Sequence, residues 1–168
     1  DDGRSVKIEL VADTMITRRL PQLWLRITLL ETTERVGTTV GALARPTGAE
    51  YYSLVHDLPE WMAPPETGTS ILMRGDGRAT VLEAARLRTR FQQLFADPLV
   101  KEIVVTPRAT RVMVQAAEGE RAAHLFLRQT RFPLATVPSD TIRSAIAMAK
   151  SVSTLLAEPD RADTHQAA

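Results

Sequence analysis

The sequence has no cysteine among its 168 residues. This absence excludes disulfide frameworks, zinc or iron–sulfur sites built on thiolates, and enzymes with a cysteine nucleophile. Long apolar runs are also missing, because no stretch approaches the ~18 residues needed to cross a bilayer, and we expect no transmembrane segment in this chain. Aromatic residues make up only 5% of the sequence, which argues against the aromatic surfaces that bind RNA or single strands.

The sequence also lacks a large net charge. It has 21 Lys and Arg residues and 20 Asp and Glu residues, which gives a net charge of +1. Such a balance creates no overall field that attracts nucleic acid or an anionic membrane. The charges are nevertheless unevenly spread. Four carboxylates and no basic residue lie between Arg45 and Arg74, whereas residues 74–131 carry 11 basic and 6 acidic side chains. A chain divided in this way can dock through complementary faces, on itself or on a partner.

What the chain has is an ordinary globular composition, with 44% hydrophobic and 24% charged residues. Alternating apolar residues predict strands, and apolar residues at helical spacing predict amphipathic helices. The segregated order of these segments predicts an α+β fold, a mainly antiparallel sheet of about six to seven strands with two amphipathic helices packed on one face. The expected strands cover residues 6–10, 23–29 (in a central position), 51–55, 69–73, 103–106, 110–114 and 124–132, the last three as a meander. Residues 32–45 also favour a strand, with a helix capped by Thr33 as the alternative. The expected helices cover residues 79–96 and 139–157.

We expect residues 1–157 to form a single α+β domain, followed by a polar mobile tail over 158–168. The segment 57–68 contains three prolines and a glycine, which predicts a long loop without regular structure. Because this loop is similar to a linker, a subdivision near residues 66–70 is the alternative. The start at Asp1 has neither an initiator methionine nor a signal peptide, so we expect a trimmed chain, for which a membrane-tethered parent is one alternative.

Large side chains concentrate around this acidic, proline-rich loop, where four of them fall within twelve residues. Side chains of this kind anchor protein partners. We predict a partner-binding surface with Trp61 and Tyr52 as anchors and with Glu60 and Glu66 in its polar rim. In the alternative interpretation, Trp61 folds back and closes a sheet edge or the end of the core. The predicted partner-binding residues are Tyr51, Tyr52, Trp61, Met62, Glu60 and Glu66.

A second candidate site lies between a predicted strand and a predicted helix, where backbone N–H groups and the helix dipole can bind an anion. Its residues would be His56, Arg74, Gly75, Gly77 and Arg78. Neither of the glycine-rich phosphate-binding motifs is complete in this segment, and the carboxylate of Asp76 would repel a phosphate. A plain turn in which Asp76 caps the backbone is therefore the alternative.

Residues suited to catalysis do not converge in the sequence. His56 and Asp57, with Glu50 and Glu60 nearby, form the only local cluster of histidine and carboxylates. The other two histidines have no partner at metal-ligand spacing, and no nucleophile-elbow motif is present. We therefore predict no catalytic residues, no metal site and no cofactor.

These observations predict a noncatalytic protein-interaction or accessory domain, such as the soluble part of a larger or membrane-associated assembly. One alternative is a small-ligand sensor or enzyme with a pocket between sheet and helices and with His56, Asp57 and Arg74 at its mouth. The arginines of segment 86–90 support a second alternative, an Arg-mediated nucleic-acid binder.

Overall fold

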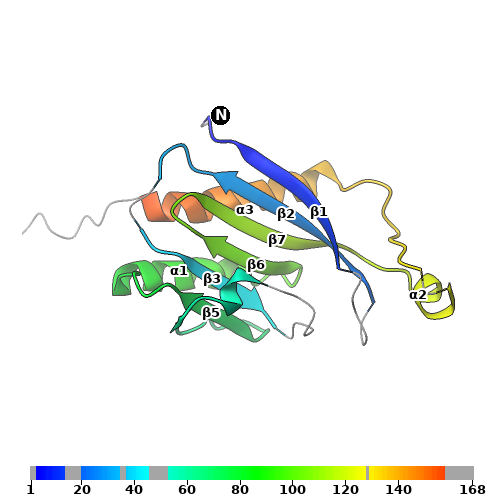
Figure 1. The fold of residues 1–168 in the computed structure, drawn as a ribbon, viewed down its shortest axis with the longest axis horizontal. Helices are drawn as coiled ribbons and strands as arrows, with labels where there is room; N and C mark the ends of the chain where they lie inside the picture. Colours follow the sequence, from blue (N-terminus) through cyan, green and yellow to red (C-terminus); the bar gives the residue numbers. More distant parts are fainter. Residues whose placement is uncertain (1–2, 14–19, 35–36, 46–52, 128, 158–168) are drawn as a thin grey trace, which may run out of the picture.

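The computed structural model describes residues 3–13, 20–34, 37–45, 53–127 and 129–157. Within these ranges the chain forms one antiparallel sheet of seven strands, in the order β1-β2-β7-β6-β3-β5-β4 (Figure 1). The strands are β1 (Val6–Asp13), β2 (Gln22–Leu30), β3 (Val40–Ala44), β4 (Glu60–Trp61), β5 (Ile71–Gly75), β6 (Val100–Val105) and β7 (Ala109–Glu118). The helices are the 3-10 turn η1 (Leu54–His56), α1 (Val81–Leu94), α2 (Arg121–Leu127) and α3 (Ser139–Ala157).

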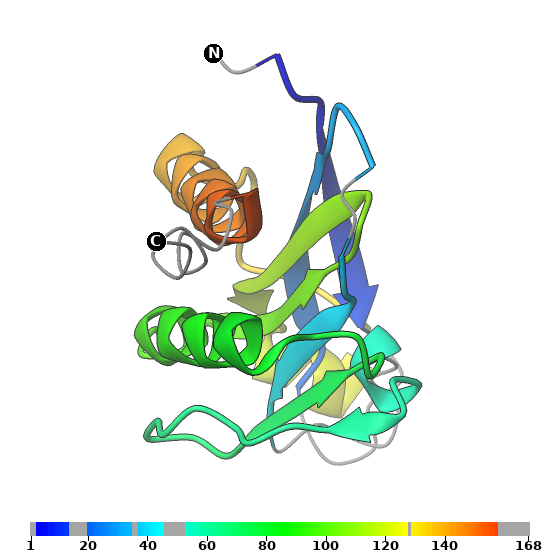
Figure 2. The same cartoon turned by 90° about the vertical axis from the view of Figure 1, so that its left-hand side faces the viewer.

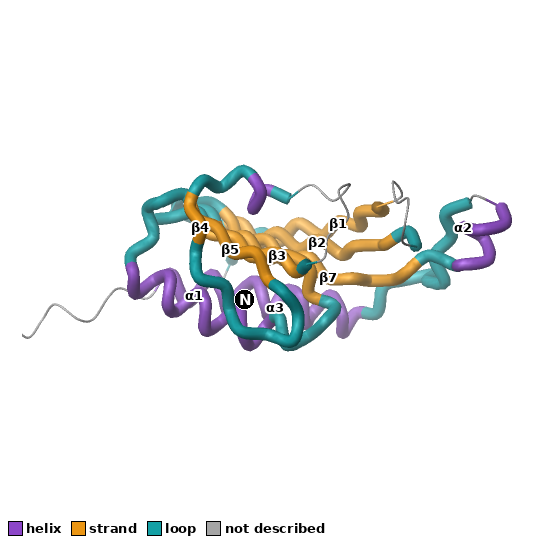
Figure 3. The backbone as a smooth tube through the Cα atoms, turned by 90° about the horizontal axis from the view of Figure 1, so that it is seen from below, coloured by secondary structure: helices purple, strands orange, loops and turns teal. Residues whose placement is uncertain are grey.

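Two of these helices cover one face of the sheet. α1 and α3 lie on the same side of the strands in Figures 2 and 3, and α3 packs on β2 and β7. The main core fills the layer between helices and strands, and it includes the fully buried side chains of Ile27, Phe91 and Ala149. The expected α+β architecture, with two helices on one face of an antiparallel sheet, is confirmed.

The alternation of residue types in β2 determines which side chains reach this core. Leu25, Ile27 and Leu29 are buried against the helices, whereas Arg26 and Thr28 lie on the opposite face, called the open face below. The predicted central position of this strand is wrong, because β2 is second from the edge and β6 is central. All six residues of β6 are buried.

Both long helices predicted by apolar spacing are confirmed. α1 begins with a capping box, in which the Thr80 hydroxyl accepts the N–H of Glu83 at 3.1 Å and the Glu83 carboxylate accepts the N–H of Thr80 at 2.8 Å. These bonds satisfy N–H groups that a helix start leaves without partners. One turn apart along α1, Leu87 and Phe91 reach the core. α3 begins at Ser139, as expected.

The predicted strand over residues 51–55 is wrong in its described part. The hydroxyl of Ser53 accepts the N–H of Val55 at 3.1 Å and caps η1. The capping preference of serine therefore outweighs the β preference of valine here. Val55 packs on the open face in a second, smaller core. The other buried members of that core are Leu43, Leu72 and Val104.

The predicted strand over residues 124–132 is wrong, and so is the three-stranded meander that it would complete. Residues 121–127 form α2, which lies apart from the sheet at one end of the molecule (Figure 1). This segment is rich in alanine and leucine, which are strong helix formers. The alternation of Leu125 and Leu127 does not mark a buried strand face, because both side chains are exposed. β7 pairs instead with β2 and β6.

The proline-rich segment 57–68 contains one piece of regular structure, the two-residue strand β4. Glu60 and Trp61 pair there with Gly75 and Arg74 of β5, so the expectation of a loop without regular structure is wrong at this point. The strands that precede residues 66–70 and the strands that follow them belong to one sheet. The expected tail over 158–168 lies outside the described residues.

Candidate interaction surface

Trp61 combines exposure to solvent with a fixed position. Its side chain is 68% exposed, yet its ring lies against the guanidinium of Arg74, whose central carbon is 4.1 Å from the ring centroid. The two residues are opposite each other in the β4–β5 ladder, so the backbone pairing sets up the stack. Such a cation–π contact is worth about 0.5–1 kcal/mol at exposed sites. Trp61 therefore does not close the end of the core, although it belongs to the strand that forms the sheet edge beside β5.

Arg74 is itself held by backbone carbonyl groups. Its Nη1 donates to the carbonyl oxygen of His56 at 2.8 Å and to that of Leu58 at 3.1 Å. These bonds tie the end of η1 to β5 and fix the guanidinium against the ring of Trp61. The structure thus brings together one predicted partner anchor, Trp61, with two residues of the predicted anion site, His56 and Arg74.

Gly75 allows β4 to lie close to β5. A Cβ atom at Gly75 would lie 2.9 Å from Sδ of Met62 and 3.0 Å from a carboxylate oxygen of Glu60. Both side chains are on the helix side of β4, where they line a groove of about 290 Å³ beside the start of α1. The apolar groups that complete this groove belong to Ala63, Met73, Ala79, Val81, Ala84 and Ala85. The stack of Trp61 and this groove lie on opposite faces of β4. Together they are called the β4 edge below.

Three carboxylates lie on the segment that contains β4. Glu60 lines the groove, and Glu66 is exposed on the loop that follows β4. Asp57 is exposed on the loop that precedes β4. The rim predicted from the sequence is therefore placed at the surface, with Arg88 of α1 as a basic residue at the groove. The two remaining predicted contact residues, at positions 51 and 52, are tyrosines outside the described residues.

Asp76 closes the turn between β5 and α1. Its carboxylate accepts hydrogen bonds from the Thr38 hydroxyl at 2.7 Å, the Thr39 N–H at 2.9 Å and the Arg78 N–H at 3.1 Å. Gly77 has a φ of 84°, which glycine adopts without strain. The predicted anion-site residues Gly77 and Arg78 therefore lie exposed in a turn in which Asp76 caps the backbone, as in the alternative interpretation.

Replacing Asp76 with asparagine is expected to lower the free energy of unfolding by about 1–2 kcal/mol at neutral pH. Burial raises the pKa of Asp76, but the hydrogen bonds from Thr38, Thr39 and Arg78 outweigh burial and hold this pKa below its usual value. Because the folded-state pKa is lowered, the carboxylate stabilises the fold above the ordinary aspartate pKa of about 3.9. This stabilisation is lost as the pH falls through the folded-state pKa.

Urea unfolding at a series of pH values measures this effect. The difference between wild type and Asp76→Asn should be largest near neutral pH and should shrink in acid. Glu66→Gln, at an exposed carboxylate, is the matched control and should leave stability unchanged. If the difference in the free energy of unfolding between wild type and Asp76→Asn stayed constant from neutral to strongly acidic pH, the ionised carboxylate would not stabilise the fold as described.

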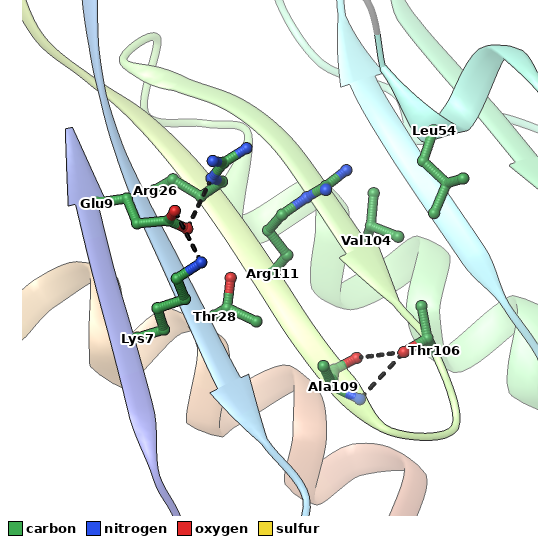
Figure 4. A pocket seen from close by; sticks show the side chains of 9 residues that line it. All are labelled: Lys7, Glu9, Arg26, Thr28, Leu54, Val104, Thr106, Ala109 and Arg111. Atoms are coloured by element: carbon green, nitrogen blue, oxygen red, sulfur yellow. Dashed lines mark hydrogen bonds and ion pairs between the residues drawn. The ribbon is translucent and has the colours of Figure 1, made fainter. Parts of the chain in front are cut away.

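A second groove, of about 340 Å³, lies on the open face of the sheet (Figure 4). Three cations line it, and two of them meet Glu9, with Lys7 Nζ at 2.9 Å and Arg26 Nε at 3.1 Å from its carboxylate. The hydrogen bond from Lys7, followed by that from Arg26, holds the pKa of the Glu9 carboxyl below its usual value. The third cation is Arg111, and the lining is completed by Thr28, Leu54, Val104, Thr106 and Ala109.

Arg111, which lines this open-face groove, also binds a buried carboxylate. Its Nη2 and Nε lie 2.7 and 2.9 Å from the same oxygen of Glu102, whose side chain is 1% exposed. A buried ion pair of this kind needs close bonding to offset the loss of hydration. The groove lining contains neither histidine nor serine. Its arrangement is that of cross-strand ion pairs between β1 and β2 and between β6 and β7.

The arginines of segment 86–90 do not share one face of α1. Residues 86 and 90 are one helical turn apart, whereas residue 88 lies on roughly the opposite side of the helix. Arg90 Nη1 donates to the side-chain oxygen of Gln93 at 2.9 Å. This placement spreads the basic charge around the helix.

α2 presents an apolar surface on residues whose alternation predicts a strand. The side chains of Leu125, Phe126 and Leu127 are 62%, 83% and 60% exposed. The backbone after α2 bonds back to this helix, because the N–H of Gln129 donates to the carbonyl oxygen of Ala123 at 3.0 Å. The run of helix-forming residues directly after Gly119 is the signal that could have identified this helix.

Three further findings bear on the class of function. Among the described residues, no group of three or more His, Asp or Glu side chains could hold a metal ion. The described helices are too short or too polar to cross a membrane. No family model matches the chain, and comparisons with curated proteins and with solved structures find no match. The geometry of the surfaces is therefore the basis for inferring the function.

Proposed function

We propose that this chain is a protein-interaction domain whose contact surface is the β4 edge. The observation that carries the proposal is the state of Trp61, which is 68% exposed and at the same time stacked on Arg74. Tryptophan and arginine are enriched among the residues that dominate binding energy at interfaces. A side chain that is already ordered loses less entropy when a partner docks.

The surroundings of Trp61 support a partner with a definite chemistry. The groove bordered by Met62 is mainly apolar and has room for an apolar side chain. The carboxylates of Glu60, Asp57 and Glu66 favour basic residues beside that side chain. The expected partner is therefore a peptide segment or loop that combines a large apolar residue with arginine or lysine, and the domain would serve as an accessory part of a larger assembly.

Selection of a displayed peptide library against the full chain tests this proposal. We expect the selected peptides to be rich in basic and large apolar residues. Trp61→Ala should weaken their binding by about tenfold or more, as expected for an interface residue of this kind. Isothermal titration calorimetry with the selected synthetic peptides measures the loss.

Phe126→Ala is the matched control, because it removes another exposed aromatic side chain at a distant position, on α2. It should leave peptide affinity unchanged. Peptides that bind Trp61→Ala as tightly as wild type, or that lose affinity only in Phe126→Ala, would overturn the proposed contact surface. Thermal unfolding of both variants checks that each remains folded, as expected for changes at exposed positions.

A further inference from the structure

β1 forms the edge of the sheet opposite to β4. Its residues pair with β2 from Val6 to Asp13, and within the described ranges β2 is its only neighbour in the sheet. An edge strand of this length offers a row of backbone N–H and C=O groups to another strand. β4 has only two residues, so β1 is the edge suited to pairing along a strand.

The β1–β2 ladder shows which backbone groups of β1 face outward. The N–H of Leu30 donates to the carbonyl oxygen of Ser5 at 2.9 Å, so the backbone groups of Ser5 point toward β2. Backbone groups along a strand alternate in direction from one residue to the next. Those of Val6, Ile8 and Leu10 therefore point away from the sheet.

The side chains of Ile8 and Leu10 form an apolar strip at this edge. They lie on the helix side of the sheet, opposite Ile27 and Leu25 of β2. They are nevertheless 48% and 54% exposed, and α3 packs mainly on the neighbouring strands β2 and β7. A second strand beside β1 would bury this strip.

We propose that two copies of this chain associate by antiparallel pairing of β1 with β1, with Ile8 opposite Ile8 at the two-fold axis. In this register, Val6 faces Leu10 of the second copy, and Lys7 faces Glu9 of the second copy. Apolar residues then meet on the helix side and opposite charges meet on the open face, and both kinds of cross-strand pair are stabilising. The interface is isologous, and the sheet continues from one copy into the other.

The backbone directions agree with this register. The outward N–H and C=O groups of Val6, Ile8 and Leu10 meet their counterparts at hydrogen-bonded positions, where facing residues exchange two bonds. Lys7 and Glu9 then fall on the non-hydrogen-bonded positions, where facing side chains are closest. The charge pairs are therefore placed where they contribute most.

Charge distinguishes this register from its neighbours. Centring the pair on Lys7 or on Glu9 would place two like charges opposite each other, which is destabilising. Centring it on Ile8 instead brings Lys7 of the second copy to Glu9, which already accepts hydrogen bonds from Lys7 and Arg26 of its own chain (Figure 4). Charged residues on an edge strand discourage indiscriminate pairing, and here they disfavour the two alignments adjacent to the proposed one.

Sedimentation velocity of the full chain over a concentration series tests the association. We expect the mass to rise from the 18.5 kDa of one chain toward twice that value. Ile8→Lys would place two ammonium groups opposite each other at the axis and should weaken the dimer by about tenfold or more. Val81→Lys, the same kind of change at a side chain of α1 that is 90% exposed, should leave the dimer unchanged.

A charge exchange tests the register itself. Lys7→Glu and Glu9→Lys should each weaken self-association, because each variant opposes like charges. A mixture of the two variants should restore association as a heterodimer, since every charge of one chain then faces an opposite charge of the other. A wild type that stays monomeric, a dimer that survives Ile8→Lys, or two charge variants whose mixture does not associate would each overturn the proposal. Thermal unfolding confirms that each variant is folded.

Discussion

Replacing Phe91 with alanine is expected to lower the free energy of unfolding by about 3–5 kcal/mol. Phe91 is fully buried in the main core, and its ring meets that of Phe95 edge to face, with centroids 6.3 Å apart. The variant loses buried apolar area and this aromatic contact, and it leaves a cavity between α1 and the sheet. Because a domain is stable by only about 5–15 kcal/mol, the loss is a large share of the total.

Urea unfolding followed by circular dichroism measures the change. Gln92→Ala, at the next residue of α1 and on its solvent side, is the matched control and should alter stability by no more than about 0.5 kcal/mol. If Phe91→Ala cost no more than this control, the packing of α1 on the sheet would not be as described.

The second large effect is expected at Arg111. Arg111→Ala should cost about 3–5 kcal/mol, because the desolvation of the buried Glu102 carboxylate is then no longer offset by the guanidinium. Arg26→Ala is the matched control, since it removes a guanidinium from Glu9 on the same face of the sheet. Its effect should be much smaller, because water screens a pair that lies partly at the surface.

A double replacement separates the charge from the packing in this pair. Glu102→Leu combined with Arg111→Met should recover most of the stability lost in Arg111→Ala, because apolar side chains of similar volume replace a buried ion pair at little cost. Equilibrium unfolding of the single and double variants gives the comparison. Equal losses in Arg111→Ala and Arg26→Ala would contradict the distinction between the buried and the partly exposed pair.

Most helices and strands of this fold follow from local patterns in the sequence. The alternation over residues 23–29 and 110–114 predicts β2 and β7, and the apolar stripes over 79–96 and 139–157 predict α1 and α3. Each of these segments buries one face only, and the period of its apolar residues reports that face directly. The patterns do not contain the order of the strands. β2 and β7 are far apart in the sequence, and their pairing depends on the core that α3 completes.

Two of the segments with the wrong secondary structure, residues 121–127 and 53–55, differ from the prediction for local reasons. Residues 121–127 contain alternating leucines, but these side chains are exposed, so their alternation does not indicate a buried strand face. Residues 53–55 have β-favouring valine, but the hydroxyl of Ser53 satisfies a backbone N–H and favours a turn. In both segments hydrogen bonding within a few residues determines the structure.

The candidate surface could be predicted in part. The concentration of large side chains in an acidic, proline-rich segment indicated Trp61, and the structure places it exposed at the sheet edge. Its stack on Arg74 could not be predicted, because these two residues meet only when β4 pairs with β5. The bonds from Arg74 to the carbonyls of His56 and Leu58 likewise depend on how η1 folds over the open face.

The two tryptophans of this chain occupy opposite surroundings. Trp24 is 7% exposed, and the ammonium of Lys101 lies 5.8 Å from its ring centroid, whereas Trp61 is 68% exposed at the β4 edge. Indole emission moves to longer wavelength when the ring contacts water, so the two residues emit differently in the folded chain. With Trp61 replaced, the remaining fluorescence reports unfolding of the sheet. With Trp24 replaced, it reports the docking of a partner, so the chain carries separate optical probes for folding and for binding.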